Sequence, residues 1–287
     1  MRLNKSILRV MKENWGQYIG MLYMLILSVF LFVALTITAQ NLKYNKDMYV
    51  KNNVQEDLEF YTTNKIDNIS KIEDKFDLKL QETLVKEHEY GDKTLRLFTP
   101  NEKVNITAVL EGSMPRVGEI ALDPQFAKVN KLNIGEIYHI GNSSYKISGY
   151  IGMPNYAYIL EKDGDMVNNP KTFGIGILNK EDMVSGTYLY SVKYNNENKD
   201  VYEQSKTLKS YLNNNGVNII NWIYAKNNMK ISILDVEVMA ISAYSIILPT
   251  VILLITVVLI SIVLGRMIKN EMANIGTLYA LGYRKKK

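Results

Sequence analysis

The chain contains no cysteine, and it has only two histidines, His88 and His139, among its 287 residues. Without cysteine, a domain exported from the cytoplasm gains nothing from disulfides and must be stabilised by its apolar core. Both histidines fall in predicted strands, and neither has a second histidine at a metal-ligand spacing. We therefore predict no metal site in this chain and a structural or exposed role for both histidines.

Sequence signatures of enzymes are also missing. The chain has no Gly-Lys dipeptide, so it carries no Walker-type phosphate loop, and it has neither a G-x-S-x-G nor an HExxH motif. No pair of carboxylates stands in a pattern typical of acid–base catalysis. We expect a non-catalytic chain with no catalytic residue and no cofactor of its own, whose source of energy lies in another protein.

Two long uncharged apolar segments lie near the two ends of the chain. The first covers residues 18–39 and the second residues 238–265, and each reaches the ~20 residues that a helix needs to cross a bilayer. We predict transmembrane helices over residues 18–40 and 238–265. A cleaved signal peptide is the alternative for the first segment, but that segment is longer than the ~7–15 apolar residues of a signal sequence.

The distribution of charge predicts which side of the membrane each part occupies. Residues 1–14 carry a net charge of +3 and residues 266–287 carry +5, whereas the residues between them carry −3. Basic residues beside membrane helices stay in the cytoplasm. We therefore predict that both termini are cytoplasmic and that residues 41–237 lie outside the cytoplasm.

The first 17 residues have the pattern of an amphipathic helix. Apolar side chains recur at steps of three and four residues, at Leu3, Ile7, Leu8, Met11 and Trp15, and basic residues occupy the other face. This regular stripe favours a helix lying in the headgroup region over a plain basic flank. The predicted anchors at the membrane interface are Trp15, Arg9, Lys12, Arg266 and Lys269.

Residues 41–237 mix strand and helix patterns without strict alternation, which is typical of an α+β domain. Alternating stretches predict strands over residues 57–63, 104–110, 172–178, 187–194 and 217–224, and strand pairs within 78–100 and 134–151. Helical spacing predicts helices over residues 64–76 and 200–216, and another after Asp123 as N-cap with Pro124 at its first position. The predicted fold class is a membrane protein in which two transmembrane α-helices flank an α+β extracytoplasmic domain, with the two ends of this domain close together.

The segment after the second apolar run, residues 266–287, has an unusual pattern. The helix is expected to continue through Ile275 and then to be interrupted by Gly276 and Gly282. The apolar piece between the glycines is too short to form a stable helix alone in water. It is either a membrane-surface hook with snorkelling lysines or a docking helix for a cytoplasmic protein.

Here the sequence resembles a known family. The residues RMIKNEMANIGTLYALGYRKK, at positions 266–286, resemble the segment after the second membrane helix of FtsX-like ABC transporter permeases, where R…E-I-G-x-L-x-A-L-G-[YA]-x-[KR] recurs. Residues 110–152 are similar to the MacB-type periplasmic core, with G-x-x-P-x-x-G-E-I-x-L, a short helix, L-x-x-G-E/D-x-x-x-I and a tyrosine-bearing strand. The basic start, residues 6–22, also looks like that family's start. In one departure, Asn274 stands where the family usually has glutamate, which puts in doubt a salt bridge from that position.

The resemblance implies a permease subunit of a bacterial cell membrane. Such a subunit transmits ATP-driven motion from a cytoplasmic ABC ATPase, which binds the ATP and magnesium, to the extracytoplasmic domain. The implied work is export or extraction of a lipid, peptide or lipoprotein, or control of an envelope process. The implied partners are the ATPase, the remaining permease half or a second permease copy, and membrane lipid, but no nucleic acid. The ATPase-coupling residues implied by the motif are Asn274, Ile275, Gly276, Leu278, Tyr279, Leu281, Gly282, Tyr283 and Arg284.

FtsX-like permeases have at least four membrane helices, so the resemblance implies that residues 1–287 are a truncated product or a fragment.

A membrane-anchored sensor with an extracytoplasmic receptor domain is the alternative function. Such receptors have the same order of helix, outer domain and helix, but they continue into a heptad-patterned signalling helix, and no heptads are visible here. A membrane-anchored enzyme lacks any catalytic constellation. We therefore favour the permease.

Overall fold

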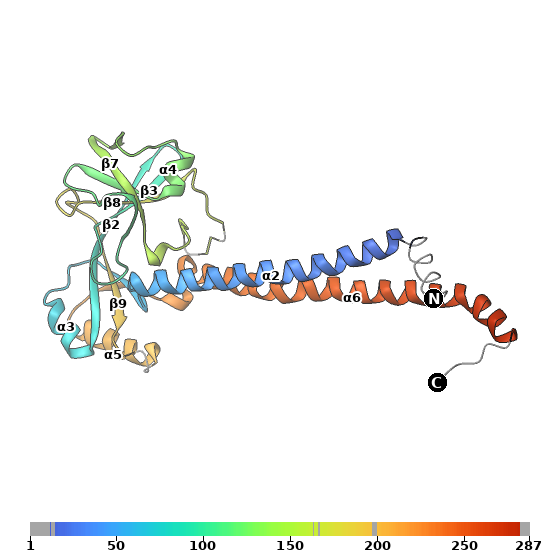
Figure 1. Cartoon of the computed structure of the whole chain (residues 1–287). Helices are drawn as coiled ribbons and strands as arrows, with labels where there is room; N and C mark the ends of the chain where they lie inside the picture. Colours follow the sequence, from blue (N-terminus) through green and yellow to red (C-terminus); the bar gives the residue numbers. More distant parts are fainter. Residues whose placement is uncertain (1–11, 13–14, 163, 166, 197–199, 282–287) are drawn as a thin grey trace. The chain divides into compact units, whose positions relative to one another are not determined.

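The computed structural model describes residues 12, 15–162, 164–165, 167–196 and 200–281 (Figure 1). The chain forms two compact units. Unit 1 combines the residues up to Tyr44 with those from Val238 onward, and unit 2 is Asn45–Glu237. Two long apolar helices, one near each end of the chain, therefore flank a domain built on a mixed sheet, as the sequence predicted.

The long helices are α2 (Trp15–Asn52) and α6 (Met229–Ala280). Both are long and apolar enough to cross a membrane. Within unit 1 they run antiparallel and side by side (Figure 1), and the Ser28 hydroxyl of α2 donates a hydrogen bond to the carbonyl of Pro249 in α6 at 2.9 Å. Each helix is longer than its apolar segment, because the polar residues that follow residue 40 and precede residue 238 continue the helical conformation.

The two helices of unit 1 distribute their side chains in an unusual way. Buried positions mostly carry small or hydroxyl-bearing side chains: Ser28, Ala39, Ser245 and Thr256. Large apolar side chains point outward, as Phe30 and Leu254 do. A helix pair stable in water buries its aliphatic stripe, whereas membrane helices pack through small residues and expose large apolar ones to lipid. Unit 1 therefore packs mostly through small or hydroxyl-bearing side chains and exposes many of its large apolar ones.

The predicted break at Gly276 is wrong. Helix α6 passes through Gly276 without interruption and ends at Ala280, and the amide of Leu281 still donates to the carbonyl of Thr277 at 3.0 Å. A glycine inside a helix costs only ~1 kcal/mol relative to alanine, and each residue added to an existing helix forms a new hydrogen bond. The apolar piece before Leu281 is thus the end of a 52-residue helix and not an isolated turn. Gly282 lies outside the described residues.

Unit 2 is built on a ten-stranded mixed sheet with the order β10-β1-β9-β2-β3-β8-β5-β7-β4, and β6 pairs with β7. Two strand pairs, β3 with β8 and β5 with β7, are parallel, and the other pairs are antiparallel. The strands are β1 (Leu58–Thr62), β2 (Leu78–Tyr90), β3 (Lys93–Phe98), β4 (Ala108–Gly112), β5 (Glu119–Leu122), β6 (Ile137–Ile140), β7 (Ser143–Gly152), β8 (Phe173–Leu178), β9 (Thr187–Tyr194) and β10 (Ile219–Tyr224).

Three short helices cover parts of this sheet: α3 (Ile69–Phe76), α4 (Pro124–Val129) and α5 (Val201–Asn214). The predicted cap of α4 is confirmed, because the Asp123 carboxylate accepts the amide of Phe126 at 2.8 Å and Pro124 occupies the first helical position. Helix α3 begins later than predicted. Asn68 takes a left-handed conformation with φ of 54°, so the helix starts only at Ile69.

Both predicted strand pairs are present, as β2 with β3 and as β6 with β7. The strand predicted over residues 104–110 is wrong in its first half, since β4 begins at Ala108. Asn105 instead has φ of 51°, which an extended strand cannot contain. Its apolar neighbours Val104 and Ile106 produce the alternating pattern of a strand in the sequence. In the structure, however, Asn105 and Ile106 donate backbone hydrogen bonds to Val54 and Asn53.

The core of unit 2 consists of three apolar clusters. The first packs β1, β2 and β9 against α3 and α5 around Phe60 and Leu208. The other two lie among β3, β5, β7 and β8, where Phe126 of α4 is fully buried. The long strand β2 contributes Leu80 to the first cluster and Val85 to the second, and β9 is shared in the same way. These two strands join the parts of the sheet into one domain.

Candidate functional site

Both long helices join unit 2 at the same strand pair. Helix α2 ends at Asn52 shortly before β1, and α6 begins at Met229 shortly after β10. Leu58 of β1 pairs with Tyr224 of β10 in an antiparallel ladder. The two ends of the domain therefore lie side by side, as the sequence predicted. We call residues 53–59 together with Asn105, Asn228 and Lys230 the helix–sheet junction.

The backbone of the helix–sheet junction contains two residues in a strained conformation. Val54 and Asn105 have φ of 50° and 51°, in the left-handed region that β-branched residues such as valine rarely adopt. Two hydrogen bonds hold them: the amide of Asn105 donates to the carbonyl of Val54, and the amide of Ile106 to that of Asn53, both at 2.8 Å. Such strain persists only where the surrounding structure enforces it. The direction in which the chain leaves α2 is thus fixed by residues 53–54 and 105–106.

The side chain of Asn105 joins this link to the sheet. Its Oδ1 accepts the backbone amide of Glu56 at 3.0 Å, and its Nδ2 donates to Glu56 Oε2 at 2.7 Å and to the hydroxyl of Ser191 in β9 at 3.0 Å. Asn105 and Ser191 are fully buried, and Glu56 is nearly so. Burial raises the pKa of Glu56 well above its ordinary value, and the negative charge of Glu59 raises it further.

The beginning of α6 supplies the opposite charge. Lys230 is the second residue of α6, and its Nζ lies 3.7 Å from Oε1 of Glu59, which also accepts from Nδ2 of Asn228 at 3.3 Å. All three residues are buried. The Lys230 ammonium also lies 4.8 Å from the centre of the Tyr156 ring, within the range of a cation–π contact. Breaking a buried ion pair by removing one partner costs ~3–5 kcal/mol, so this pair holds the start of α6 against β1.

Further contacts attach the same helix ends to the rest of unit 2. Lys46 of α2 forms an ion pair with Asp235 of α6. The side-chain amide of Gln55 donates to the carbonyl of Pro154 at 2.7 Å. A β-carbon added at Gly152 of β7 would lie 2.9 Å from the hydroxyl oxygen of Tyr49 in α2, so the glycine permits a close approach. The final turns of α2 and the first turns of α6 in unit 2 are thus held by contacts from several strands and loops.

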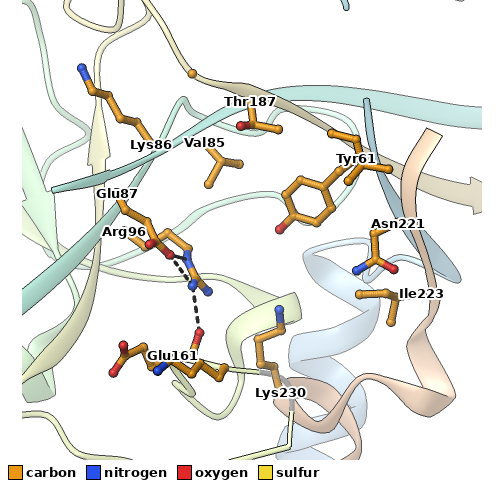
Figure 2. A pocket seen from close by; sticks show the side chains of 13 residues that line it. Tyr61, Val85, Lys86, Glu87, Arg96, Glu161, Thr187, Asn221, Ile223 and Lys230 are labelled. Atoms are coloured by element: carbon orange, nitrogen blue, oxygen red, sulfur yellow. Dashed lines mark hydrogen bonds and ion pairs between the residues drawn. The ribbon is translucent and has the colours of Figure 1, made fainter. Parts of the chain in front are cut away.

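A cleft of about 730 Å³, lined by charged, polar and apolar side chains, lies beside the helix–sheet junction (Figure 2). Lys230 points into it from α6, and Tyr61 of β1 and Asn221 of β10 point into it from the sheet. Burial raises the pKa of the Tyr61 hydroxyl well above its usual value, so Tyr61 stays a neutral hydrogen-bonding group. The cleft presents groups that can hold a polar ligand, and we assign no reaction to it.

Arg96 of β3 organises the wall of the cleft opposite Lys230. Its guanidinium donates from Nε to Glu87 at 2.9 Å and from Nη2 to the carbonyl of Glu161 at 2.8 Å (Figure 2). Its Nη1 donates to the Tyr156 hydroxyl at 2.8 Å. These bonds connect β2, β3, the short helical turn η1 (Pro154–Tyr156) and the loop after it. Tyr156 therefore contacts the cations of both Arg96 and Lys230.

The structure places the predicted coupling residues at the far end of α6. Asn274, Ile275, Gly276, Leu278 and Tyr279 lie in the last turns of the helix, and Leu281 follows it. Tyr279 and Leu281 are 63% and 76% exposed. Gly282, Tyr283 and Arg284 lie outside the described residues. The described coupling residues therefore lie within the last turns of α6 and directly after it.

The predicted membrane-interface anchors lie just before the first apolar segment and just after the second. Trp15 is the first residue of α2 and is exposed, as are Lys12, Arg266 and Lys269. Arg9 lies outside the described residues, together with most of the predicted amphipathic helix over residues 1–17. Exposure of these side chains allows an interfacial position, which stays a prediction.

Sequence reasoning missed every residue of the helix–sheet junction. Glu56 and Glu59 stand beside Asp57 in an acidic stretch that looks like a solvated turn before a strand, and Lys230 stands beside an apolar helix. One signal was available. Glu59 lies within the β1 segment Leu58–Thr62, whose other residues are mostly apolar or aromatic, and such a position demands a buried partner.

Comparisons with known proteins do not identify the chain. A scan against models of protein families finds no match, and a search of curated proteins finds none either.

Proposed function

We propose that this chain is a permease subunit of an FtsX-like ABC transporter, which converts ATP-driven motion in the cytoplasm into motion of an extracytoplasmic domain. The observation that carries the proposal is the helix–sheet junction. It ties the end of α2 and the start of α6 to one strand pair through a strained backbone link and buried polar contacts. A displacement of either helix is therefore transmitted to the sheet instead of being absorbed by a flexible linker.

Membrane insertion of unit 1 is part of this proposal. The outward-facing large apolar side chains and the buried serines and threonine favour a lipid environment over water. In the proposed arrangement residues 18–40 and 238–265 cross a bacterial cell membrane, and residues 41–237 lie outside. The ends of the chain, richer in positive charge, then stay in the cytoplasm.

The cytoplasmic partner in the proposal is an ABC ATPase. This part rests on the resemblance of residues 266–286 to the family's coupling segment. Helix α6 supports it, because it is continuous from Lys230 in the helix–sheet junction to Ala280 in the coupling segment. Closure of two ATPases on ATP would push Tyr279 and its neighbours, and a continuous helix carries that push toward β1 and β10. The work done outside is movement of a lipid, peptide or lipoprotein, or control of an envelope process.

A photo-crosslinker tests the ATPase interaction directly. Benzoylphenylalanine replaces Tyr279 in the native host, and it replaces Tyr202 as a matched control, because both tyrosines are exposed to a similar degree, 63% and 58%. We expect position 279, but not position 202, to crosslink to a protein that contains a Walker A motif. Crosslinks from position 279 to lipid alone would show that the segment is a membrane hook.

Thiol labelling tests the topology, and the absence of natural cysteine makes single-cysteine variants simple to interpret. Cysteines introduced at Ser143 and Asn214 are expected to react with a membrane-impermeant thiol reagent in intact cells. A cysteine introduced at Ser6 is expected to react only after the cells are opened. Labelling of Ser6 alone in intact cells would overturn the proposed orientation.

One observation favours the alternative function, a membrane-anchored sensor. Sensors continue from their second membrane helix into an uninterrupted cytoplasmic helix, and α6 passes through Gly276 without a break. The residues after Arg266 nevertheless lack the heptad pattern that a signalling coiled coil needs. The same crosslinking experiment separates the two functions, since a sensor would crosslink at position 279 to a second copy of this chain or to a kinase without an ABC signature.

A further inference from the structure

The helix–sheet junction contains more buried negative charge than positive charge. Glu56 and Glu59 are 3% and 1% exposed, and Lys230, the cation that faces them, is 4% exposed. If both carboxylates were ionised, the cluster would hold one uncompensated negative charge away from water, which is strongly unfavourable. One proton on either carboxylate makes the cluster neutral.

The hydrogen bonds of the two carboxylates leave one oxygen of each without a partner. Asn105 donates to Oε2 of Glu56, and Asn228 and Lys230 approach Oε1 of Glu59. Among the described residues, Glu56 Oε1 and Glu59 Oε2 are buried and have no hydrogen-bond partner. Buried polar atoms are almost always paired, and two carboxylates that share a site cannot both ionise readily. A single proton in the cluster removes the uncompensated negative charge.

We propose that the buried cluster of Glu56, Glu59 and Lys230 holds one proton on Glu56 at neutral pH, and that release of this proton loosens the attachment of α2 and α6 to the sheet. Glu56 lies shortly after the end of α2, and Glu59 pairs with the second residue of α6. The proton therefore acts on both helix attachments at once. The proposal concerns the fold of unit 2 and holds whether or not the chain belongs to a transporter.

The electrostatic surroundings agree with this assignment. Burial raises the pKa of Glu56, and Glu59 raises it next, whereas hydrogen bonds from Ser191 and Asn105 and the charge of Lys230 lower it. Tyr61 faces the cluster, since beyond the effect of burial the charges of Glu59 and Glu56 raise its pKa, and Tyr156 and Arg96 also act on Tyr61. Arg96 is itself hydrogen-bonded to Glu87.

The sign of the pH dependence follows from the raised pKa of Glu56. Its stabilising contribution as a neutral group is fully present below the ordinary glutamate pKa of 4.5. That contribution is lost as the pH rises through the higher pKa of the folded state. The junction is therefore tighter when protonated and looser when the proton has left.

Infrared spectroscopy of the full chain in lipid nanodiscs tests the proposal. We expect a carbonyl band of a protonated carboxyl group at pH 7 that disappears reversibly at higher pH. Glu56→Gln and Glu59→Gln should each remove the band, because the one remaining carboxylate pairs with Lys230. The matched control is Glu89→Gln, an exposed residue of β2, and it should leave the band unchanged. Absence of the band in the unaltered chain, or its persistence in both pair variants, would overturn the proposal.

Hydrogen exchange measures the looseness of the junction separately. After correction for intrinsic exchange rates, amides of residues 46–57 and 229–237 should exchange at least threefold faster above the titration than below it. In Glu56→Gln this acceleration should vanish, because position 56 then carries no charge at any pH while its side-chain carbonyl can still accept from Asn105. Equal acceleration of exchange in the Gln variant and in the unaltered chain would contradict the proposal that proton release loosens the helix–sheet junction. The infrared titration of the unaltered chain needs no variant, so a misfolded variant does not prevent the test.

Discussion

Replacement of Asn105 by alanine is the most direct test of the helix–sheet junction. The Asn105 side chain makes three hydrogen bonds in a buried site, two with Glu56 and one with Ser191. Each contributes ~1 kcal/mol net, and alanine in the left-handed conformation adds ~1 kcal/mol of strain. We therefore expect Asn105→Ala to lower the free energy of unfolding of unit 2 by about 4 kcal/mol.

The assay follows thermal unfolding of the full chain in detergent by the fluorescence of Trp222. This residue stacks on Phe60 in the core, with ring centroids 4.9 Å apart, and a Trp15→Phe background removes the second tryptophan. For a unit of this size, 1 kcal/mol shifts the melting temperature by ~2–4 °C, so Asn105→Ala should lower it by about 10 °C.

A matched glycine variant separates the hydrogen bonds from the backbone strain. Glycine adopts φ of about 51° at no steric cost, so Asn105→Gly should be ~1 kcal/mol less destabilising than Asn105→Ala. A decrease of less than about 3 °C for the alanine variant would show that water replaces these bonds at little cost. The junction would then be too weak to transmit force, and the reasoning for the proposed function would fail.

Three further outcomes are expected. Under the proposed function, Leu278→Asp should weaken binding to the ABC ATPase at least tenfold in a pull-down, since burial of a leucine contributes ~1.5–3 kcal/mol, while Lys286→Gln should have little effect. Intact binding in the first variant, with release from liposomes in the second, would indicate a membrane hook. Gly174→Ala should prevent stable folding of unit 2, because the added β-carbon would lie 2.4 Å from Cγ of the buried Phe126; a circular dichroism melt like that of the unaltered chain would show that the ring can move. Ser28→Leu should separate α2 from α6 and strongly lower the free energy of unfolding measured in sodium dodecyl sulfate. Ser28→Ala should lower that free energy by no more than ~1–2 kcal/mol.

Local signals in the sequence predicted the elements that depend on neighbouring residues. The cap of α4 at Asp123 follows from the preference of an aspartate oxygen for free helix amides, and it is found as predicted. The two hairpins follow from turn residues between alternating stretches. The predicted break of the helix at Gly276 is wrong, however, because the effect of a single glycine is small. At Gly276 its cost of ~1 kcal/mol is smaller than the gain from continuing a long helix.

The helix–sheet junction could not be predicted, because its parts come from distant segments. Asn105 is 49 residues from Glu56, and Asn228 is 169 residues from Glu59. In the sequence, Val104 and Ile106 alternate around Asn105 as in a strand, and the acids near β1 look solvated. Only their burial in the same place gives these residues their partners and raises the pKa of Glu56.

The sequence by itself determined the two long helices and the α+β character of the domain between them. Uninterrupted apolar segments and alternating strands need no knowledge of distant residues, because each expresses a repeat of its own backbone conformation. The tertiary structure decided the order of the ten strands, the pairing of β1 with β10 and the enclosure of Glu56, Glu59 and Lys230. Electrostatic energies depend on burial and on distance through space, and neither quantity exists until the sheet brings those segments together.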